Sequence, residues 1–292
     1  MPLREELASG AAYLDLVTRL LQRMRVANPT SGLWEAADLQ WWWRRDRPSD
    51  RGGQVFWLDD RRDPVAAVIF TDWARIWVCD VLVAPDTEAV FGTVWQRALD
   101  RMAALGLETV EVAARDDDTT MLAALAAAGF SPTGEAGAAT WLDAVARPTV
   151  APLRIGFRLR SRADTADRQH HMTSERNGEH VAERLAECSL YQPALDLLVE
   201  APNGHLAAAG LFWPDPVTGV GLVEPMRTET PYRRLGLARH LLTAGLDLLA
   251  AHGCARLKVS YEADNPAARD LYLGAGFTPE STTQTYRNRN GQ

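Results

Sequence analysis

A short glycine-containing stretch has the residue types of an anion-binding loop. Arg233-Arg234-Leu235-Gly236-Leu237-Ala238-Arg239 leads into a segment with apolar residues at helical spacing, at positions 237, 241, 242, 246, 248 and 249. Gly236 and Ala238 leave little bulk beside the backbone, so an anion can approach the free amides at the helix start. The helix dipole and the arginines favour negative charge there. The stretch predicts a pyrophosphate cradle, with an ordinary basic helix start as the alternative.

A second stretch, Asn265-Pro266-Ala-Ala-Arg-Asp-Leu-Tyr-Leu-Gly-Ala-Gly-Phe277, follows a predicted strand at 256–261. Asn265 can cap a helix and Pro266 can occupy its first turn, which predicts a short helix over 267–273. Tyr272 lies on this helix. Half-buried packing with a hydrogen-bonded hydroxyl is the usual role of such a tyrosine, and a chemical role is the alternative.

Both stretches belong to the second copy of a weak internal repeat. Ala128-Gly129-Phe130 recurs as Ala275-Gly276-Phe277, and Gly106 recurs as Gly253, at one offset of 147 residues (276 − 129 and 253 − 106). In each copy an apolar helical stretch, a glycine and a short strand follow in the same order. The chain is therefore predicted to hold two related units.

Predicted strands precede the helix in each copy. In the second copy, runs at 196–201 and 205–213 flank Asn203-Gly204, a dipeptide suited to a tight hairpin turn, and another run covers 220–228. The first copy has runs at 54–58, 65–70 and 75–83. Antiparallel strands followed by a crossover helix and a strand predict an α/β (α+β) fold, with a mixed, mostly antiparallel sheet flanked by helices in each domain. The proline-containing stretch 146–152 is the predicted linker between domains 1–147 and 153–292.

The bulk composition excludes several classes of protein. A chain of 292 residues with 47% apolar residues can fill two cores. Its net charge of −7 argues against sequence-independent nucleic-acid binding, which needs basic surfaces. No run approaches the roughly 20 apolar residues that span a bilayer, and the first residues do not resemble a signal peptide. We therefore expect a cytoplasmic protein with no nucleic-acid or membrane partner.

A metal site is not expected. The three cysteines, Cys79, Cys188 and Cys254, have no paired close spacing. His170 and His171 are adjacent, so on a helix or a strand their side chains would point in different directions.

In their order, the strand, R-R-L-G-L-A, the helix, the next strand and N-P-A-A-R-D-L-Y-L-G-A-G-F resemble the GNAT N-acetyltransferase superfamily. Arg233, Gly236 and Ala238 fill its Q/R-x-x-G-x-G/A motif. The resemblance implies acetyl-CoA as the donor, with its pyrophosphate on the backbone amides of Arg234, Leu235, Gly236, Leu237, Ala238 and Arg239. It also implies that the pantetheine arm pairs like an added strand with Met226, Arg227 and Thr228. Asn265 is then expected near the coenzyme and Tyr272 near its sulfur.

Acetyl transfer to an amine requires proton movements that two residues are placed to perform. A primary amine is mostly protonated at neutral pH, with a pKa on the order of 10, so a group must accept a proton before attack. Glu224, two residues before Met226, is the predicted base, directly or through water; a structural strand-end carboxylate is the alternative. A strand amide near Arg227 could hold the oxyanion, and Tyr272 could donate to the departing thiolate.

The first copy lacks these residues. At the offset of 147, positions 233, 236 and 238 correspond to Asp86, Ala89 and Phe91, and Tyr272 corresponds to Leu125. Acidic residues and a phenylalanine cannot cradle a pyrophosphate. Domain 1–147 is therefore predicted to be a degenerate, non-catalytic GNAT-like domain, as in tandem arrangements related to mycothiol synthase.

The sequence thus predicts an acetyl-CoA-dependent N-acetyltransferase that acts on a small amine by direct transfer from the thioester, in a monomer or a homodimer. Two alternatives stay open. One is acetylation of a protein N-terminus or lysine, and the other is a non-catalytic acetyl-CoA-binding sensor or scaffold.

Overall fold

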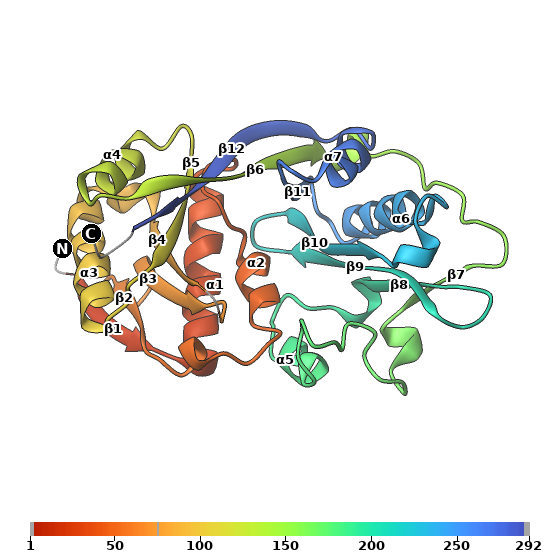
Figure 1. Ribbon diagram of the computed structural model, residues 1–292, viewed down its shortest axis with the longest axis horizontal. Coiled ribbons are helices and arrows are strands. Elements are labelled where there is room, and N and C mark those ends of the chain that lie inside the picture. Colours follow the sequence, from red (N-terminus) through yellow and green to blue (C-terminus); the bar gives the residue numbers. More distant parts are fainter. Residues whose placement is uncertain (1–2, 75, 289–292) are drawn as a thin grey trace. The chain divides into compact units, whose positions relative to one another are not determined.

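The chain divides into two compact units in the computed structural model, which describes residues 3–74 and 76–288 (Figure 1). Unit 1 comprises Met1–Leu39, Asp46–Ala138 and Ser281–Gln292, and unit 2 comprises Gln40–Arg45 and Ala139–Glu280. The predicted boundary at 147–153 does not coincide with this division. The chain changes unit inside a strand, at Ala138. Gln40–Arg45 belong to unit 2 although unit 1 surrounds them in the sequence, and Ser281–Gln292 belong to unit 1 although they follow unit 2.

Unit 1 is built on one sheet with the strand order β1-β2-β3-β4-β5-β12-β6. Its elements are β1 (Arg4–Ala8), α1 (Gly10–Ala27), β2 (Gln54–Leu58), β3 (Pro64–Asp72), β4 (Trp77–Val83), the 3₁₀ segment η2 (Pro85–Val90), α3 (Phe91–Ala104), β5 (Val110–Arg115), α4 (Thr119–Ala127), and parts of β6 (Ser131–Asp143) and β12 (Thr278–Arg287). The strands predicted at 54–58 and 65–70 are confirmed. The run predicted at 75–83 is a strand from Trp77 onward, and residue 75 lies outside the described residues.

Helices cover both faces of the unit 1 sheet, α1 on one side and α3 on the other (Figure 1). Tyr13 of α1 packs on Phe56 of β2, whereas Trp95 of α3 belongs to a core with Val55 and Cys79. Because both faces are covered, β2 is buried along its whole length, which explains the unbroken apolar run at 55–58.

Unit 2 has the strand order β6-β11-β10-β9-β8-β7. Its elements are β7 (Arg158–Ser161), α5 (Val181–Ala186), β8 (Asp196–Glu200), β9 (Leu206–Asp215), β10 (Val220–Thr228), η6 (Thr230–Tyr232), α6 (Leu237–Ala251), β11 (Arg256–Glu262) and α7 (Pro266–Leu273). The predicted hairpin around Asn203-Gly204 is the connection between β8 and β9. The mixed, mostly antiparallel architecture expected from the sequence is confirmed in both units.

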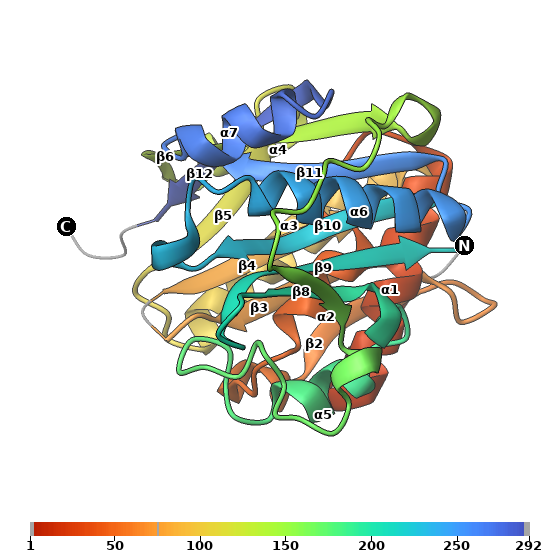
Figure 2. The ribbon, with the colours of Figure 1, turned by 90° about the vertical axis from the view of Figure 1, so that its right-hand side faces the viewer.

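Helix α6 runs alongside the strands β9, β10 and β11 of unit 2 (Figure 2), and a glycine allows it to pack closely on them. Its apolar face packs on a core that includes Phe212 of β9, Val223 of β10 and Leu257 of β11. A Cβ atom placed on Gly245 would lie 2.1 Å from the ring of Phe212. The helix therefore approaches the sheet closely because residue 245 has no side chain.

The short segment 40–45, which holds the last residues of α2 (Ala36–Trp42), packs within unit 2. The Gln40 amide donates to Ser189 Oγ (2.9 Å) and accepts from the Leu190 amide (2.9 Å). Trp43 Nε1 donates to Glu187 (2.6 Å), and the Arg184 guanidinium stacks 3.4 Å from the centroid of the Trp43 ring. Gln40 and Trp43 thus hold segment 40–45 in unit 2.

The last described strand completes the first unit. Residues 283–287 of β12 pair antiparallel with residues 115–111 of β5. Asn288 Oδ1 accepts from the Val110 amide (2.8 Å), and Arg287 pairs with Glu111. Among the described residues, no helix combines the length and the apolar character needed to cross a membrane.

Candidate active site

The predicted site residues of unit 2 lie along β10, where this strand separates from β11. The parallel pairing runs from Val220↔Arg256 to Leu222↔Lys258, while β10 continues to Thr228 in antiparallel pairing with β9. A bulge between Val223 and Met226 shifts the register there. Bulges redirect side chains next to functional sites.

Glu224 lies in this bulge, and its backbone is held in place. Trp213 Nε1 of β9 donates to the Glu224 carbonyl oxygen (2.6 Å). After Pro225, residues Met226, Arg227 and Thr228 return to regular pairing opposite Gly210, Ala209 and Ala208. Since β9 pairs along one edge of this stretch, its other edge faces the side where β11 has turned away.

The glycine stretch forms the turn that begins α6. Gly236 is the N-cap, with φ 79° and ψ 1°, and Arg234 also has a positive φ of 64°. No atom lies within 4 Å of a Cβ built on Gly236, so space is open above this backbone. Arg233, Arg234 and Arg239 are exposed, whereas Leu237 is buried and fixes the helix start in the core. The first amides of α6 therefore lie at the surface among guanidinium groups, as the predicted cradle requires.

Two of the predicted coenzyme-binding side chains have local partners. Arg227 forms an ion pair with Glu229 (2.7 Å), and Arg233 Nε donates to the Thr228 carbonyl oxygen (3.4 Å). Leu235 packs against the core of unit 2. These contacts hold the loop that connects β10 with α6.

Helix α7 positions Asn265 and Tyr272. Asn265 Oδ1 accepts from the Ala268 amide (3.1 Å), so this side chain is the helix cap that the sequence predicts. Tyr272 is buried, and its ring makes an edge contact with Phe277 (centroids 6.3 Å apart). Burial raises the pKa of the Tyr272 hydroxyl, and the charge of Glu224 raises it further. The structure thus places a protonated phenol of α7 near a carboxylate of β10.

A second polar cluster, which the sequence did not predict, lies in the loop before β8. His170 Nε2 lies 2.9 Å from Asp196 Oδ2, and His171 Nε2 lies 2.9 Å from Asp196 Oδ1. The Tyr191 hydroxyl donates to Asp196 Oδ2 (2.7 Å). The expectation that adjacent histidines diverge is wrong here. Their rings stack, with centroids 4.9 Å apart, because residues 170–171 are in neither a helix nor a strand.

The ligating atoms of His170, His171 and Asp196 lie within 4.8 Å of one another, which is compatible with a shared cation. One hydrogen bond favours another role. His170 Nδ1 accepts from the Met172 amide (3.1 Å), so the neutral ring carries its proton on Nε2 and donates it to Asp196. The cluster is best described as two donors, His170 and Tyr191, on one buried carboxylate, with the ring of His171 close beside it.

In unit 1, the counterpart of the cradle has a different chemistry. The N-cap of α3 is Val90 with a φ of −90°, so Val90 corresponds to Gly236 and the correspondence with Ala89 is wrong by one residue. The preceding segment η2 contributes Asp86 and Glu88 rather than arginines. At α4, Asp118 caps the helix as Asn265 caps α7, so the offset of 147 holds there and Leu125 corresponds to Tyr272.

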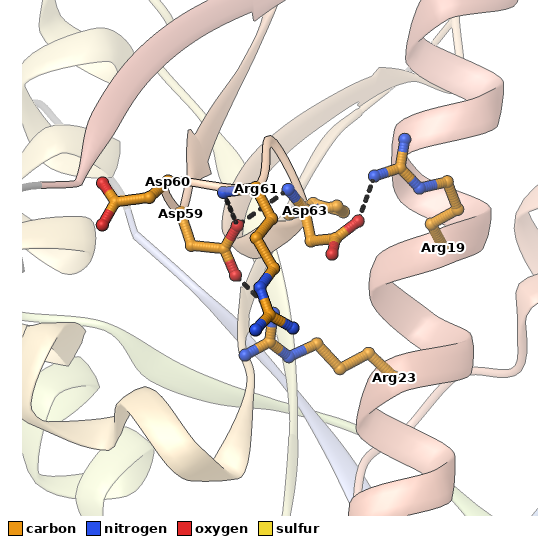
Figure 3. A pocket seen from close by; sticks show the side chains of 7 residues that line it. Arg19, Arg23, Asp59, Asp60, Arg61 and Asp63 are labelled. Carbon is orange, nitrogen blue, oxygen red and sulfur yellow. Dashed lines mark hydrogen bonds and ion pairs between the residues drawn. The ribbon is translucent and has the colours of Figure 1, made fainter.

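A hollow of about 750 Å³ on unit 1 is lined by arginines of α1 and by the turn between β2 and β3 (Figure 3). Arg19 pairs with Asp63 (2.6 Å), and Arg23 pairs with Asp59 (3.3 Å) and with Asp86 (2.5 Å). Asp59 also accepts from the amides of Arg61 and Asp63. These charges largely neutralise one another, so the hollow is a surface ion-pair network.

Comparison with known proteins agrees with the geometry of unit 2. Residues 160–277 match the profile described as the acetyltransferase (GNAT) family. A mycothiol acetyltransferase of Clavibacter michiganensis subsp. michiganensis is 37% identical over 105 residues, which are 36% of this chain and 33% of the relative. A mycothiol acetyltransferase of Clavibacter sepedonicus is 35% identical over 105 residues, 36% of this chain and 34% of the relative. The match thus spans about a third of the length of these relatives.

Solved structures resemble the whole chain. A tandem GNAT protein from the clavulanic acid biosynthesis pathway superposes with a TM-score of 0.69 at 16% identity, over 100% of this chain and 99% of that one. A GCN5-related N-acetyltransferase from Sphaerobacter thermophilus gives 0.62 at 17% identity, over 99% and 96% of the two chains. At such identities the likeness establishes the fold. Residues 160–277 thus carry the sequence features of the GNAT acetyltransferase family, and the chain has the fold of tandem GNAT proteins.

Proposed function

We propose that unit 2 transfers the acetyl group of acetyl-CoA to the amine of a small molecule. The observation that carries this proposal is the exposed, arginine-flanked turn at Gly236, which adjoins a strand edge on β10 and the Tyr272–Glu224 pair. When bound, acetyl-CoA supplies an activated acetyl thioester. The relatives named mycothiol acetyltransferase make a small-molecule acceptor the first one to test.

Each residue would have a separate role. The amides of residues 234–239 would hold the pyrophosphate, and the free edge of Met226, Arg227 and Thr228 would pair with the pantetheine amides. Glu224 would accept the proton of the incoming ammonium, directly or through water. The Tyr272 hydroxyl, which keeps its proton because its pKa is raised, would donate to the leaving sulfur. An amide near Arg227 would stabilise the oxyanion.

Calorimetric titration with acetyl-CoA tests the cradle without knowledge of the acceptor. Gly236→Glu should abolish binding, because it places a carboxylate at the phosphate position. Gly253→Glu is the matched control. Gly253 also has a positive φ (84°) and open space around its Cβ position, but it lies at the other end of α6. The control should therefore bind one acetyl-CoA per chain like the wild type.

Equal binding by both variants, each folded, would refute the cradle assignment. If binding is confirmed, thiol release in the presence of small amines tests transfer. Release with peptide amines alone would point to a protein acceptor, and binding without release to any amine would point to a sensor.

A further inference from the structure

A second cavity, of about 420 Å³, lies wholly within unit 1. Its walls come from β4, from η2 and the start of α3, from the end of β5, from the start of α4 and from the loop after α1. Apolar side chains form much of the surface, among them Leu33, Trp34, Leu82, Phe91 and Met121. The cavity can therefore enclose an apolar body.

Asp80 of β4 lies in the wall of this cavity and is only 4% exposed. Its Oδ1 accepts from Trp34 Nε1 (2.8 Å), whereas its Oδ2 has no hydrogen-bond partner among the described residues. An unsatisfied buried carboxylate oxygen is costly to a folded protein. Burial raises the pKa of Asp80 to about 6, which leaves the group mostly ionised at neutral pH. The missing partner is therefore a donor, and a positively charged one is preferred.

Most of the other charged groups in the wall are also acidic. The described lining residues include four carboxylates and one guanidinium, namely Asp80, Glu88, Asp117 and Asp118 with Arg115. Arg115 is neutralised by its ion pair with Asp117 (2.6 Å). Such a wall repels phosphate groups and attracts cations.

The position of Asp80 in its unit matches that of Glu224 in unit 2. In unit 1, β4 pairs with β5 at Trp77↔Val110. In unit 2, β10 pairs with β11 at Gly221↔Leu257. Asp80 and Glu224 are each three residues further along, and each follows a residue of the core, Cys79 or Val223. A carboxylate thus stands at the same strand position in both units, while the arginine-flanked glycine turn occurs only beside Glu224 within these two sites.

We propose that this cavity binds a small molecule with a protonated amine on an apolar body, and that the ammonium group pairs with Asp80. Unit 1 is then a ligand-binding domain with a site of its own. The apolar walls would enclose the body of the ligand, and the ammonium would supply the hydrogen bond that Oδ2 lacks. This inference is independent of acetyl transfer in unit 2.

Binding can be observed at the site itself through the indole N–H of Trp34, which donates to Asp80. Its signal in a ¹H–¹⁵N spectrum of the whole protein is assigned by its loss in Trp34→Phe. The probes are hexylammonium, hexan-1-ol and hexanoate, which share a chain length and differ in charge. Hexylammonium should shift the Trp34 signal in a saturable way, and the other two should bind at least about tenfold more weakly.

Two variants test the role of the carboxylate. Asp80→Asn keeps an acceptor for Trp34 but removes the charge, and it should raise the Kd of hexylammonium at least about tenfold. Glu224→Gln changes the matched carboxylate of unit 2 and should leave the Kd at Trp34 unchanged. Equal shifts by hexan-1-ol and hexylammonium, or an unchanged Kd in a folded Asp80→Asn protein, would overturn the proposal.

Discussion

The carboxylate of Glu224 on β10 lies close enough to the hydroxyl of Tyr272 on α7 to raise its pKa, in addition to the larger effect of burial. The raised pKa keeps the Tyr272 phenol protonated at neutral pH, so it suits the donor end of a proton transfer. The pair therefore connects the two elements on either side of the proposed thioester position.

Tyr272→Phe should reduce turnover more than coenzyme affinity. The substitution keeps the ring that contacts Phe277 and removes only the hydroxyl. If this hydroxyl protonates the leaving sulfur, kcat should fall by about 10² or more, with the Kd of acetyl-CoA changed less than about threefold. Single-turnover kinetics and calorimetry check the two quantities. A wild-type rate for the chemical step would remove the acid role from Tyr272.

The close approach of α6 to β9 gives opposite expectations for two Gly→Ala substitutions. Gly245→Ala places a methyl group 2.1 Å from the Phe212 ring and should lower the free energy of unfolding by about 1–3 kcal/mol. Gly92→Ala in α3 is the control, since no atom lies within 4 Å of its Cβ position. It should raise stability by about 0.4–1 kcal/mol. Urea denaturation monitored in each unit measures both, and equal effects would contradict the packing argument.

Asp80 should make unit 1 more stable in mild acid. Its folded-state pKa of about 6 is above the ordinary aspartate value of 3.8, so the folded state binds the proton more tightly than the unfolded state. Stability from this group is greatest below pH 4 and is lost as the pH rises to 6. Asp80→Asn should therefore stabilise the protein by about 1–3 kcal/mol at pH 7.5 and have little effect at pH 4. Thermal melts at the two pH values would show whether the difference has this sign.

Asp196 should have the opposite dependence on pH. Burial alone would raise its pKa, but hydrogen bonds from His170 and His171 hold the pKa of Asp196 below 3.8. A depressed folded-state pKa gives stability that is present above the unfolded pKa and is lost as the pH falls through the folded pKa. Asp196→Asn should cost about 2–4 kcal/mol at pH 7. The difference from the wild type should shrink in acid, and a constant difference from pH 7 to pH 2 would argue against ionic pairing.

Local patterns predicted much of the fold. The apolar runs of β2 and β3, the Asn203-Gly204 hairpin and the Asn265-Pro266 helix start depend on residues close together in the sequence, and each is present. Gly236 was recognised because a helix start with a small residue has a distinct sequence pattern. Its left-handed backbone agrees with the reason given for a glycine there.

Features that depend on residues far apart in the chain could not be predicted from the sequence. Nothing in the neighbouring sequence indicates that residues 40–45 pack in unit 2. The pairing of β12 with β5 is also not predictable from side chains, because strands pair through backbone hydrogen bonds. The histidine pair was misjudged because the argument assumed regular structure where a loop brings both rings to Asp196. Asp80 was not singled out, because its hydrogen bond comes from Trp34, which lies 46 residues earlier.

The position of β12 has a consequence for synthesis on the ribosome. In unit 1 this strand lies between β5 and β6, so it inserts between two strands that were made earlier. Residue 287 is added 172 residues after residue 115 (287 − 115), which takes on the order of 10–30 s at cellular elongation rates. During that interval the nascent first unit has an incomplete sheet whose open edge can pair with other chains. Unit 1 therefore cannot complete its sheet until β12 has been made, which is after the residues of unit 2.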